Sequence, residues 1–79
     1  MLTIFRESDL KFVIYLDDHP PAHVHVFGDG SVKVALGSEN DPPMAVRIRG
    51  MKTSEVRKAL QIVAEHRAAL IEKWEEYHG

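Results

Sequence analysis

The chain has 79 residues, of which 44% are hydrophobic and 28% are charged, and its formal net charge is −2. This length predicts one domain, residues 1–79, with a thin hydrophobic core. The absence of cysteine excludes disulfides and thiolate metal sites, and the slightly acidic balance argues against a general nucleic-acid binder. Oligomerisation, a partner protein or a histidine- and carboxylate-bound metal would supplement so small a core.

Residues 1–20 lack a basic segment followed by an apolar run, so we predict no signal peptide. The apolar runs of the chain reach five residues at most, far below the roughly 20 that a membrane-spanning helix needs. We therefore expect a cytoplasmic protein that does not enter a membrane.

Short strands account for the first two-thirds of the chain. Residues 3–7 predict a weak strand, and residues 10–16 a stronger one. Apolar side chains lie on both faces of the second, which is typical of a central rather than an edge strand. Three more segments alternate in the manner of strands, at 23–27, 31–36 and 44–49. We expect an antiparallel sheet of about four strands.

The turn Gly28-Asp29-Gly30 predicts a hairpin between the third and fourth segments. A three-residue loop places His23 and His25 on one face near Lys33 and sets valines opposite each other on the other face, in the pairs Val26–Val32 and Val24–Val34. A two-residue turn instead places the histidines with the valines. We prefer the first register because it leaves no histidine facing an aliphatic core.

Residues 53–77 predict one long helix. Its apolar residues recur at steps of three, four or seven and form one stripe, made of Val56, Leu60, Val63, Leu70, Trp74 and Tyr77. Such a stripe must cover one face of the sheet. The expected fold class is therefore α+β, with a small antiparallel sheet covered on one face by one C-terminal helix.

Three histidines in a short segment suggest a metal site. His23 and His25 share a strand face about 7 Å apart, a spacing that suits zinc or another divalent metal. His19 is a candidate third ligand, and Asp17 or Asp18 is a candidate carboxylate ligand or outer partner. If this strand face turned toward the helix, His66 would be the natural fourth group.

The same residues also suit catalysis. One histidine can act as general base on a ribose 2′-hydroxyl and a second as general acid on the leaving oxygen. In this hypothesis His23 and His25 are the working groups and His19 assists them, while Arg47 and Arg49 bind the phosphoryl group. Histidines that merely form the polar face of an amphipathic strand are a third interpretation. Whether the protein is an enzyme stays open at this point.

Three segments resemble domain-of-unknown-function family 4160, a family of small prokaryotic proteins. They are T-I-F-R-E-S at the start, Y-L-D-D-H-P-P-A-H-V-H-V-F-G-D-G in the middle and L-I-E-K-W-E-E-Y-H-G at the end. The family form of the central block is H-x-P-P-H-x-H-V, matched here by His19, Pro21, His23, His25 and Val26. The chain departs from it at Ala22, which replaces the second proline, and at Pro20, which comes one position early.

The resemblance implies a gene neighbour of domain-of-unknown-function family 2442 and a toxin–antitoxin-like pair. The leading hypothesis is therefore a module component that acts on RNA through the histidine cluster and pairs with a small protein encoded alongside it. The alternative is a non-enzymatic interaction or regulatory module, such as a transcriptional regulator. It would bind a partner protein or a second copy of itself, with a metal at His19, His23 and His25.

Overall fold

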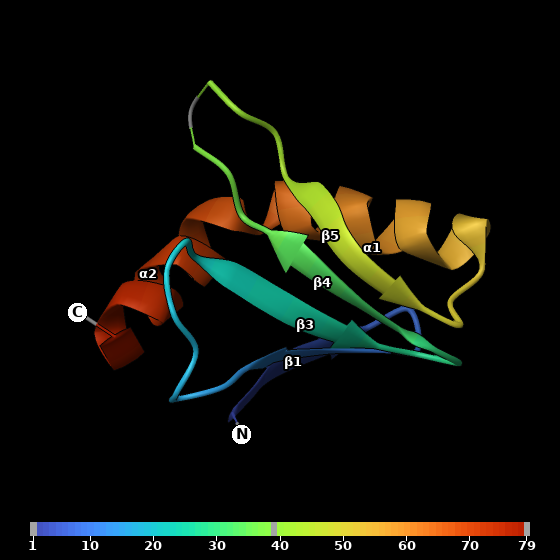
Figure 1. The fold of residues 1–79 in the computed structure, drawn as a ribbon, viewed down its shortest axis with the longest axis horizontal. Helices are drawn as coiled ribbons and strands as arrows, with labels where there is room; N and C mark the ends of the chain where they lie inside the picture. The colour runs from blue at the N-terminus through green and yellow to red at the C-terminus, as the bar shows by residue number, and fades with distance from the viewer. Residues whose placement is uncertain (1, 39, 79) are drawn as a thin grey trace.

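A five-stranded antiparallel sheet and two helices make up the protein in the computed structural model, which describes residues 2–38 and 40–78 (Figure 1). The strands are β1 (Leu2–Glu7), β2 (Leu10–Ile14), β3 (His23–Phe27), β4 (Ser31–Ala35) and β5 (Met44–Arg49). They lie side by side in chain order, each antiparallel to the next. The α+β prediction is confirmed, with one strand more than the four expected.

Turn chemistry explains the first hairpin. Ser8 and Asp9 both have positive φ, 54° and 63°, and they join β1 to β2. Two consecutive residues of this kind form a tight turn whose twist matches that of the flanking strands. The strand predicted over 10–16 ends at Ile14, and Leu16 beyond it is exposed. As expected, β2 is not an edge strand, because it lies between β1 and β3.

The second hairpin has the preferred register. Val24 lies opposite Val34 and Val26 opposite Val32, while His25 lies opposite Lys33. The Gly28 N–H donates to the Gly30 carbonyl over 2.8 Å, which closes the three-residue loop. All four valines are buried on the face that the helices cover, and the histidines belong to the other face.

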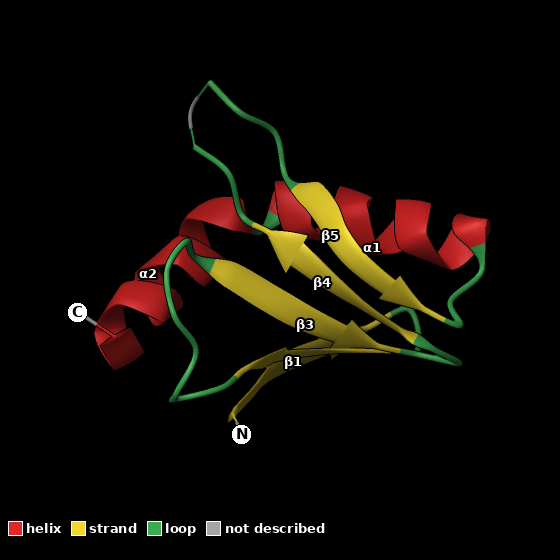
Figure 2. Cartoon of the chain, in the orientation of Figure 1, coloured by secondary structure: helices red, strands yellow, loops and turns green. Residues whose placement is uncertain are grey.

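Two helices replace the single helix predicted over 53–77. They are α1 (Thr53–Glu65) and α2 (Arg67–His78), and the chain bends between them at His66, where ψ is 14° (Figure 2). A straight helix of 25 residues would be about 37 Å long, whereas the longest extent of the molecule is 32 Å. The bend lets α2 turn toward the start of β3. Within residues 2–38 and 40–78, neither helix has the length and apolar character needed to cross a membrane.

The hydrophobic core lies between the sheet and the helices. Phe12 and Ile14 from β2 are fully buried there, and Phe5 stacks on Phe12 with ring centroids 4.5 Å apart. The helices contribute Val56, Ala59, Ile62, Val63, Leu70 and Trp74. We call this side of the sheet the covered face and the opposite side the open face.

Candidate functional site

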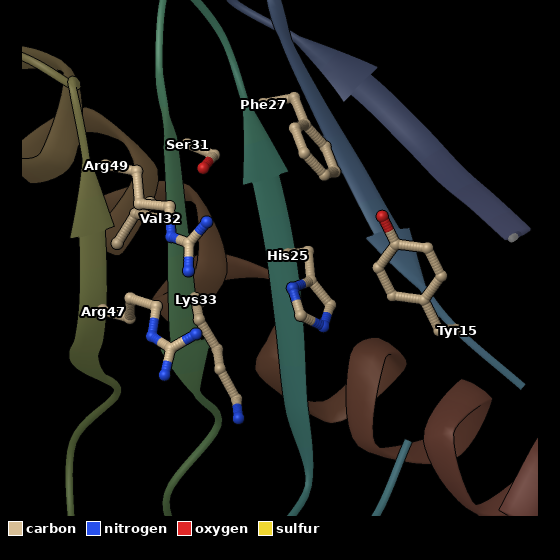
Figure 3. Close-up of a pocket in the computed structure, with 8 residues that line it drawn as sticks. All are labelled: Tyr15, His25, Phe27, Ser31, Val32, Lys33, Arg47 and Arg49. Carbon is tan, nitrogen blue, oxygen red and sulfur yellow. The ribbon is translucent and has the colours of Figure 1, made fainter. Parts of the chain in front are cut away.

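The open face carries a hollow centred on His25 (Figure 3). Lys33, Arg47 and Arg49 lie on one side of His25, Tyr15 lies on the other, and Phe27 lies two residues farther along the same strand. The strand register produces this order, because His25 is opposite Lys33, and Lys33 is in turn opposite Arg47. The hollow measures about 310 Å³ and opens to solvent, so a small group or one unit of a polymer can enter it.

We call Lys33, Arg47 and Arg49 the basic wall. Both arginines are exposed, and Lys33 is half-buried between His25 and Arg47. None of the three forms an ion pair with a carboxylate in the part of the chain that the structure describes. Guanidinium and ammonium groups that are free of carboxylates are available to bind phosphate.

A second group of polar residues adjoins the hollow, and we call it the Asp–His cluster: Asp18, His23 and His25. Asp18 Oδ2 lies 3.3 Å from His23 Nε2 and 3.3 Å from His25 Nε2. One ligand atom from each residue falls within 4.8 Å of the others. The cluster therefore combines two neighbours from one strand with a carboxylate from the preceding loop.

The loop between β2 and β3 holds Asp18 in place. The Tyr15 N–H donates to Asp18 Oδ2 over 3.1 Å, and the Asp18 N–H donates back to the Tyr15 carbonyl over 3.2 Å. These two bonds form a local turn that directs the carboxylate inward, toward the start of β3. The Asp18 side chain is only 15% exposed, so its position is well defined by its neighbours.

His23 is the buried member of the cluster, with 4% of its surface exposed. Its Nδ1 donates to the Pro21 carbonyl over 2.9 Å, which leaves Nε2 to face Asp18. The Trp74 ring packs against it with centroids 5.0 Å apart, and His25 meets it edge-on at 5.1 Å. Pro21 thus supplies a backbone acceptor that sets the orientation of the His23 ring.

The C-terminal turn of α2 contacts both Trp74 and the loop that carries Asp18. The His78 ring stacks on Trp74 with centroids 3.9 Å apart. Its Nδ1 lies 2.9 Å from the Trp74 carbonyl oxygen, and its Nε2 lies 3.0 Å from that of Tyr15. His78 therefore ties α2 to the loop that carries Asp18, a contact that no sequence signal indicated.

The electrostatics of the cluster favour an ionised Asp18 and a neutral His25. Partial burial acts to raise the pKa of Asp18. The hydrogen bond from Tyr15 N–H and the proximity of His23 and His25 outweigh that effect and hold the pKa below its usual range. Burial lowers the pKa of His25, and the Asp18 carboxylate opposes this only in part. A charged carboxylate beside a neutral imidazole is the state in which both can bind a metal.

The other predicted site residues lie in different places. His19 lines a second hollow of about 330 Å³ together with Asp18 and His23, but it is not one of the three residues whose ligand atoms lie within 4.8 Å of one another. His66 faces away from it, because its Nε2 lies 3.2 Å from Glu7 Oε1 and its ring packs on Phe5. The sequence did not distinguish Asp17 from Asp18. It placed Lys33 near the histidines and Trp74 in the helix stripe, but it indicated no part in the site for these two residues or for Tyr15 and Phe27.

Comparison with known proteins gives one match. The model of DUF4160, a domain of unknown function, matches residues 10–75. This range contains the Asp–His cluster and the basic wall. No curated protein and no solved structure matches the chain.

Proposed function

The chain belongs to the DUF4160 family, a domain family of unknown function, and we propose that it is the RNA-acting component of a toxin–antitoxin-like module. The observation that carries this proposal is the basic wall beside His25 on the open face, with the rest of the Asp–His cluster in contact with His25. The proposed activity is cleavage of the phosphodiester backbone, with Lys33, Arg47 and Arg49 binding the phosphate.

Single-stranded RNA is the substrate that suits this face. In this proposal the basic wall binds the backbone. Tyr15, on the far side of His25, and Phe27, two residues along β3, offer aromatic surfaces on which an unpaired base can stack. Sequence-tolerant binding to single strands commonly combines these two elements. The net charge of −2 fits a local binding surface rather than a protein that coats nucleic acid.

The proposed reaction begins with the ribose 2′-hydroxyl. The Asp–His cluster takes up its proton, the 2′-oxygen bonds to phosphorus, and the bond from phosphorus to the 5′-oxygen breaks, with water supplying the proton for the leaving oxygen. Arg47 and Arg49 stabilise the charge that develops on the phosphoryl oxygens. A correctly placed base typically contributes about 10²–10⁴-fold to such a rate.

Matched charge variants test the binding surface. Arg47→Gln/Arg49→Gln removes two charges from the open face, and Arg57→Gln/Lys58→Gln removes two exposed charges from α1. We expect the first pair to weaken binding of single-stranded RNA at least about tenfold. It should also reduce the slope of log affinity against log salt by roughly 1.4. Equal losses of RNA affinity in the two double variants would reject the open face as the binding surface.

Cleavage is tested on labelled single-stranded RNA in excess pure protein. We expect wild type to cut, His25→Gln to lose about 10²–10⁴-fold in rate, and Arg57→Gln/Lys58→Gln to match wild type. In cells, induction of wild type should arrest growth, and His23→Ala/His25→Ala at matched soluble expression should not. Intact RNA together with normal growth would refute the proposed function.

A second candidate function, a protein-interaction module, rests on β5. This strand is at the edge of the sheet, and it exposes Met44, Val46 and Ile48 by 64%, 58% and 53%. An edge strand with exposed apolar side chains is a template for pairing with another chain. Co-expression with the neighbouring gene product should yield a complex that Val46→Lys disrupts and Leu16→Lys, at an equally exposed site, does not. Separate elution of the two wild-type proteins would reject this candidate.

A further inference from the structure

We propose that Asp18, His23 and His25 bind one divalent cation of the zinc class, and that this metal centre stands beside the basic wall. The inference deepens the proposed function by naming the group that takes up the proton. The metal site itself follows from the geometry of the cluster and does not depend on RNA as the substrate.

The hydrogen bonds of His23 give the first argument. A carbonyl oxygen only accepts hydrogen bonds, so the contact with Pro21 places the proton of the neutral ring on Nδ1. Nε2 then presents a lone pair to the Asp18 carboxylate, 3.3 Å away. Two acceptors that face each other in a buried place repel, whereas a cation bound between them satisfies both.

His25 gives a second, independent argument. Its Nε2 is buried and makes no hydrogen bond of acceptable geometry to any residue within 2–38 and 40–78, although Asp18 Oδ2 is 3.3 Å away. A buried ring nitrogen without a partner costs free energy unless something unseen binds it. The same cation that lies between His23 and Asp18 lies within reach of this nitrogen, because all three ligand atoms are within 4.8 Å of one another.

The spacing and type of the ligands indicate the metal. Two ligands bonded to tetrahedral zinc at its usual distances lie roughly 3.4 Å apart, and Asp18 Oδ2 lies 3.3 Å from both ring nitrogens. Two imidazoles and one carboxylate suit zinc and similar borderline ions, whereas magnesium and calcium prefer oxygen ligands. Three protein ligands leave a fourth position for water or substrate, which is typical of catalytic zinc sites.

Outer contacts support the ligands in the manner of known metal centres. The Pro21 carbonyl orients His23, the Tyr15 N–H orients Asp18, and Trp74 packs on the His23 ring. Partners of this kind fix the tautomer and direction of ligating side chains. Lys33 lines both the hollow with His25 and the hollow with His23 and Asp18, so the site borders an anion-binding surface. A zinc ion there would supply a bound water of lowered pKa as the base.

The structure contains a natural control. Glu7, Glu65 and His66 also bring three ligand atoms within 4.8 Å, but the Glu7 and His66 side chains are 41% and 42% exposed and form a surface ion pair. That pair already satisfies the His66 nitrogen, so nothing there requires a metal. His66→Gln is therefore the matched variant for loss of one histidine outside the proposed site.

The test uses the untagged full chain, stripped with a chelator and then titrated with Zn²⁺ and with Co²⁺. We expect one ion per chain, a higher Tm on binding, and the intense visible absorption of tetrahedral Co²⁺. Asp18→Asn and His25→Gln should each weaken binding more than about 100-fold, the upper cost of losing a supporting contact. His66→Gln should bind as wild type does, and equal affinity in His19→Gln would show that His19 is not the fourth ligand.

Two results would overturn the inference. One is the absence of binding and of any Tm change with micromolar metal, and the other is equal weakening by His66→Gln and Asp18→Asn. Circular dichroism of each stripped variant separates loss of ligands from loss of the fold. RNA cleavage that persists in chelator would leave His25, backed by Asp18, as the base and would remove the metal from the reaction. Metal binding together with intact RNA and normal growth would instead refute the proposed function and leave the metal site intact.

Discussion

The covered face and the open face of the sheet are built from alternate residues of the same strands. Along β3, Val24 and Val26 are fully buried under the helices, whereas His25, between them, lines the hollow of the open face. Along β4, Val32 and Val34 are buried, whereas Lys33 between them belongs to the basic wall. The strand period of two residues thus separates a stabilising surface from a chemical one within five residues.

Two residues that belong to the open face by register are nevertheless buried, Val13 of β2 and His23 of β3. Val13 lies opposite His25 and is fully buried. His23 belongs to the open face by register, yet it is buried, because α2 brings Trp74 against its ring. Trp74 is also part of the hydrophobic core. The two faces should therefore respond independently to substitution where the open face is exposed, whereas stability and site geometry are coupled at Trp74 and His23.

The largest expected difference in unfolding free energy is between substitutions on the two faces of β2. Phe12→Ala removes a fully buried ring from the core and should cost about 3–5 kcal/mol of unfolding free energy. Lys11→Ala, one residue away on the other face, loses a contact with the Phe27 ring at 5.7 Å and should cost about 1 kcal/mol or less. Urea denaturation of both variants gives the comparison. Similar losses would mean that the faces are not energetically distinct.

Substitution at Trp74 tests the coupling of the faces. Trp74→Phe leaves a partial cavity and should cost about 1–2 kcal/mol. It should also weaken zinc binding, because the His23 ring loses part of its support. Leu70→Val, a truncation at another buried position of α2, should lower the unfolding free energy without changing zinc affinity. Equal effects of the two variants on affinity would place Trp74 among ordinary core residues.

In the metal-free protein, protonation of His25 on the open face should make stability depend on pH. The pKa of His25 in the folded chain is below its ordinary value of 6.5, chiefly because of burial. The unfolded chain therefore binds more protons just below that pH, and stability should fall as the pH drops through this range. Urea midpoints in chelator at pH 7.5 and 5.5 measure the loss, which His25→Gln should reduce. An unchanged midpoint in wild type would contradict the environment described for His25.

The smallest effect on stability is expected in β1, the edge strand at the other side of the sheet from β5. Glu7→Gln removes the charge that faces His66, in a pair whose side chains are both about two-fifths exposed. Exposed pairs of this kind contribute about 0–1 kcal/mol, and this contribution should decrease as salt is added. Thermal unfolding at low and high salt checks it. A large, salt-independent loss would show that this contact sets the bend between α1 and α2.

The alternation of apolar and polar residues along the strands could be predicted from the sequence. The pattern of valines and histidines in 23–27 and 31–36 selected the correct hairpin register, because the alternative would have placed histidines in an aliphatic core. The same register predicted that His25 and Lys33 are neighbours. The class of the fold followed from the same periodicities, since a period of two and a helical stripe each require a covering layer.

Tertiary structure alone decided the bend at His66 and the identity of the carboxylate. The helical stripe shows no break near His66, yet the helix ends there, and a straight helix over 53–77 would be longer than the 32 Å extent of the molecule. Asp17 and Asp18 are equivalent as neighbours in sequence, but the bond from the Tyr15 N–H turns Asp18 toward the histidines. Local periodicity specifies which residues share a face, whereas side chains from loops and separate elements meet only through backbone conformation and packing, which no short pattern encodes.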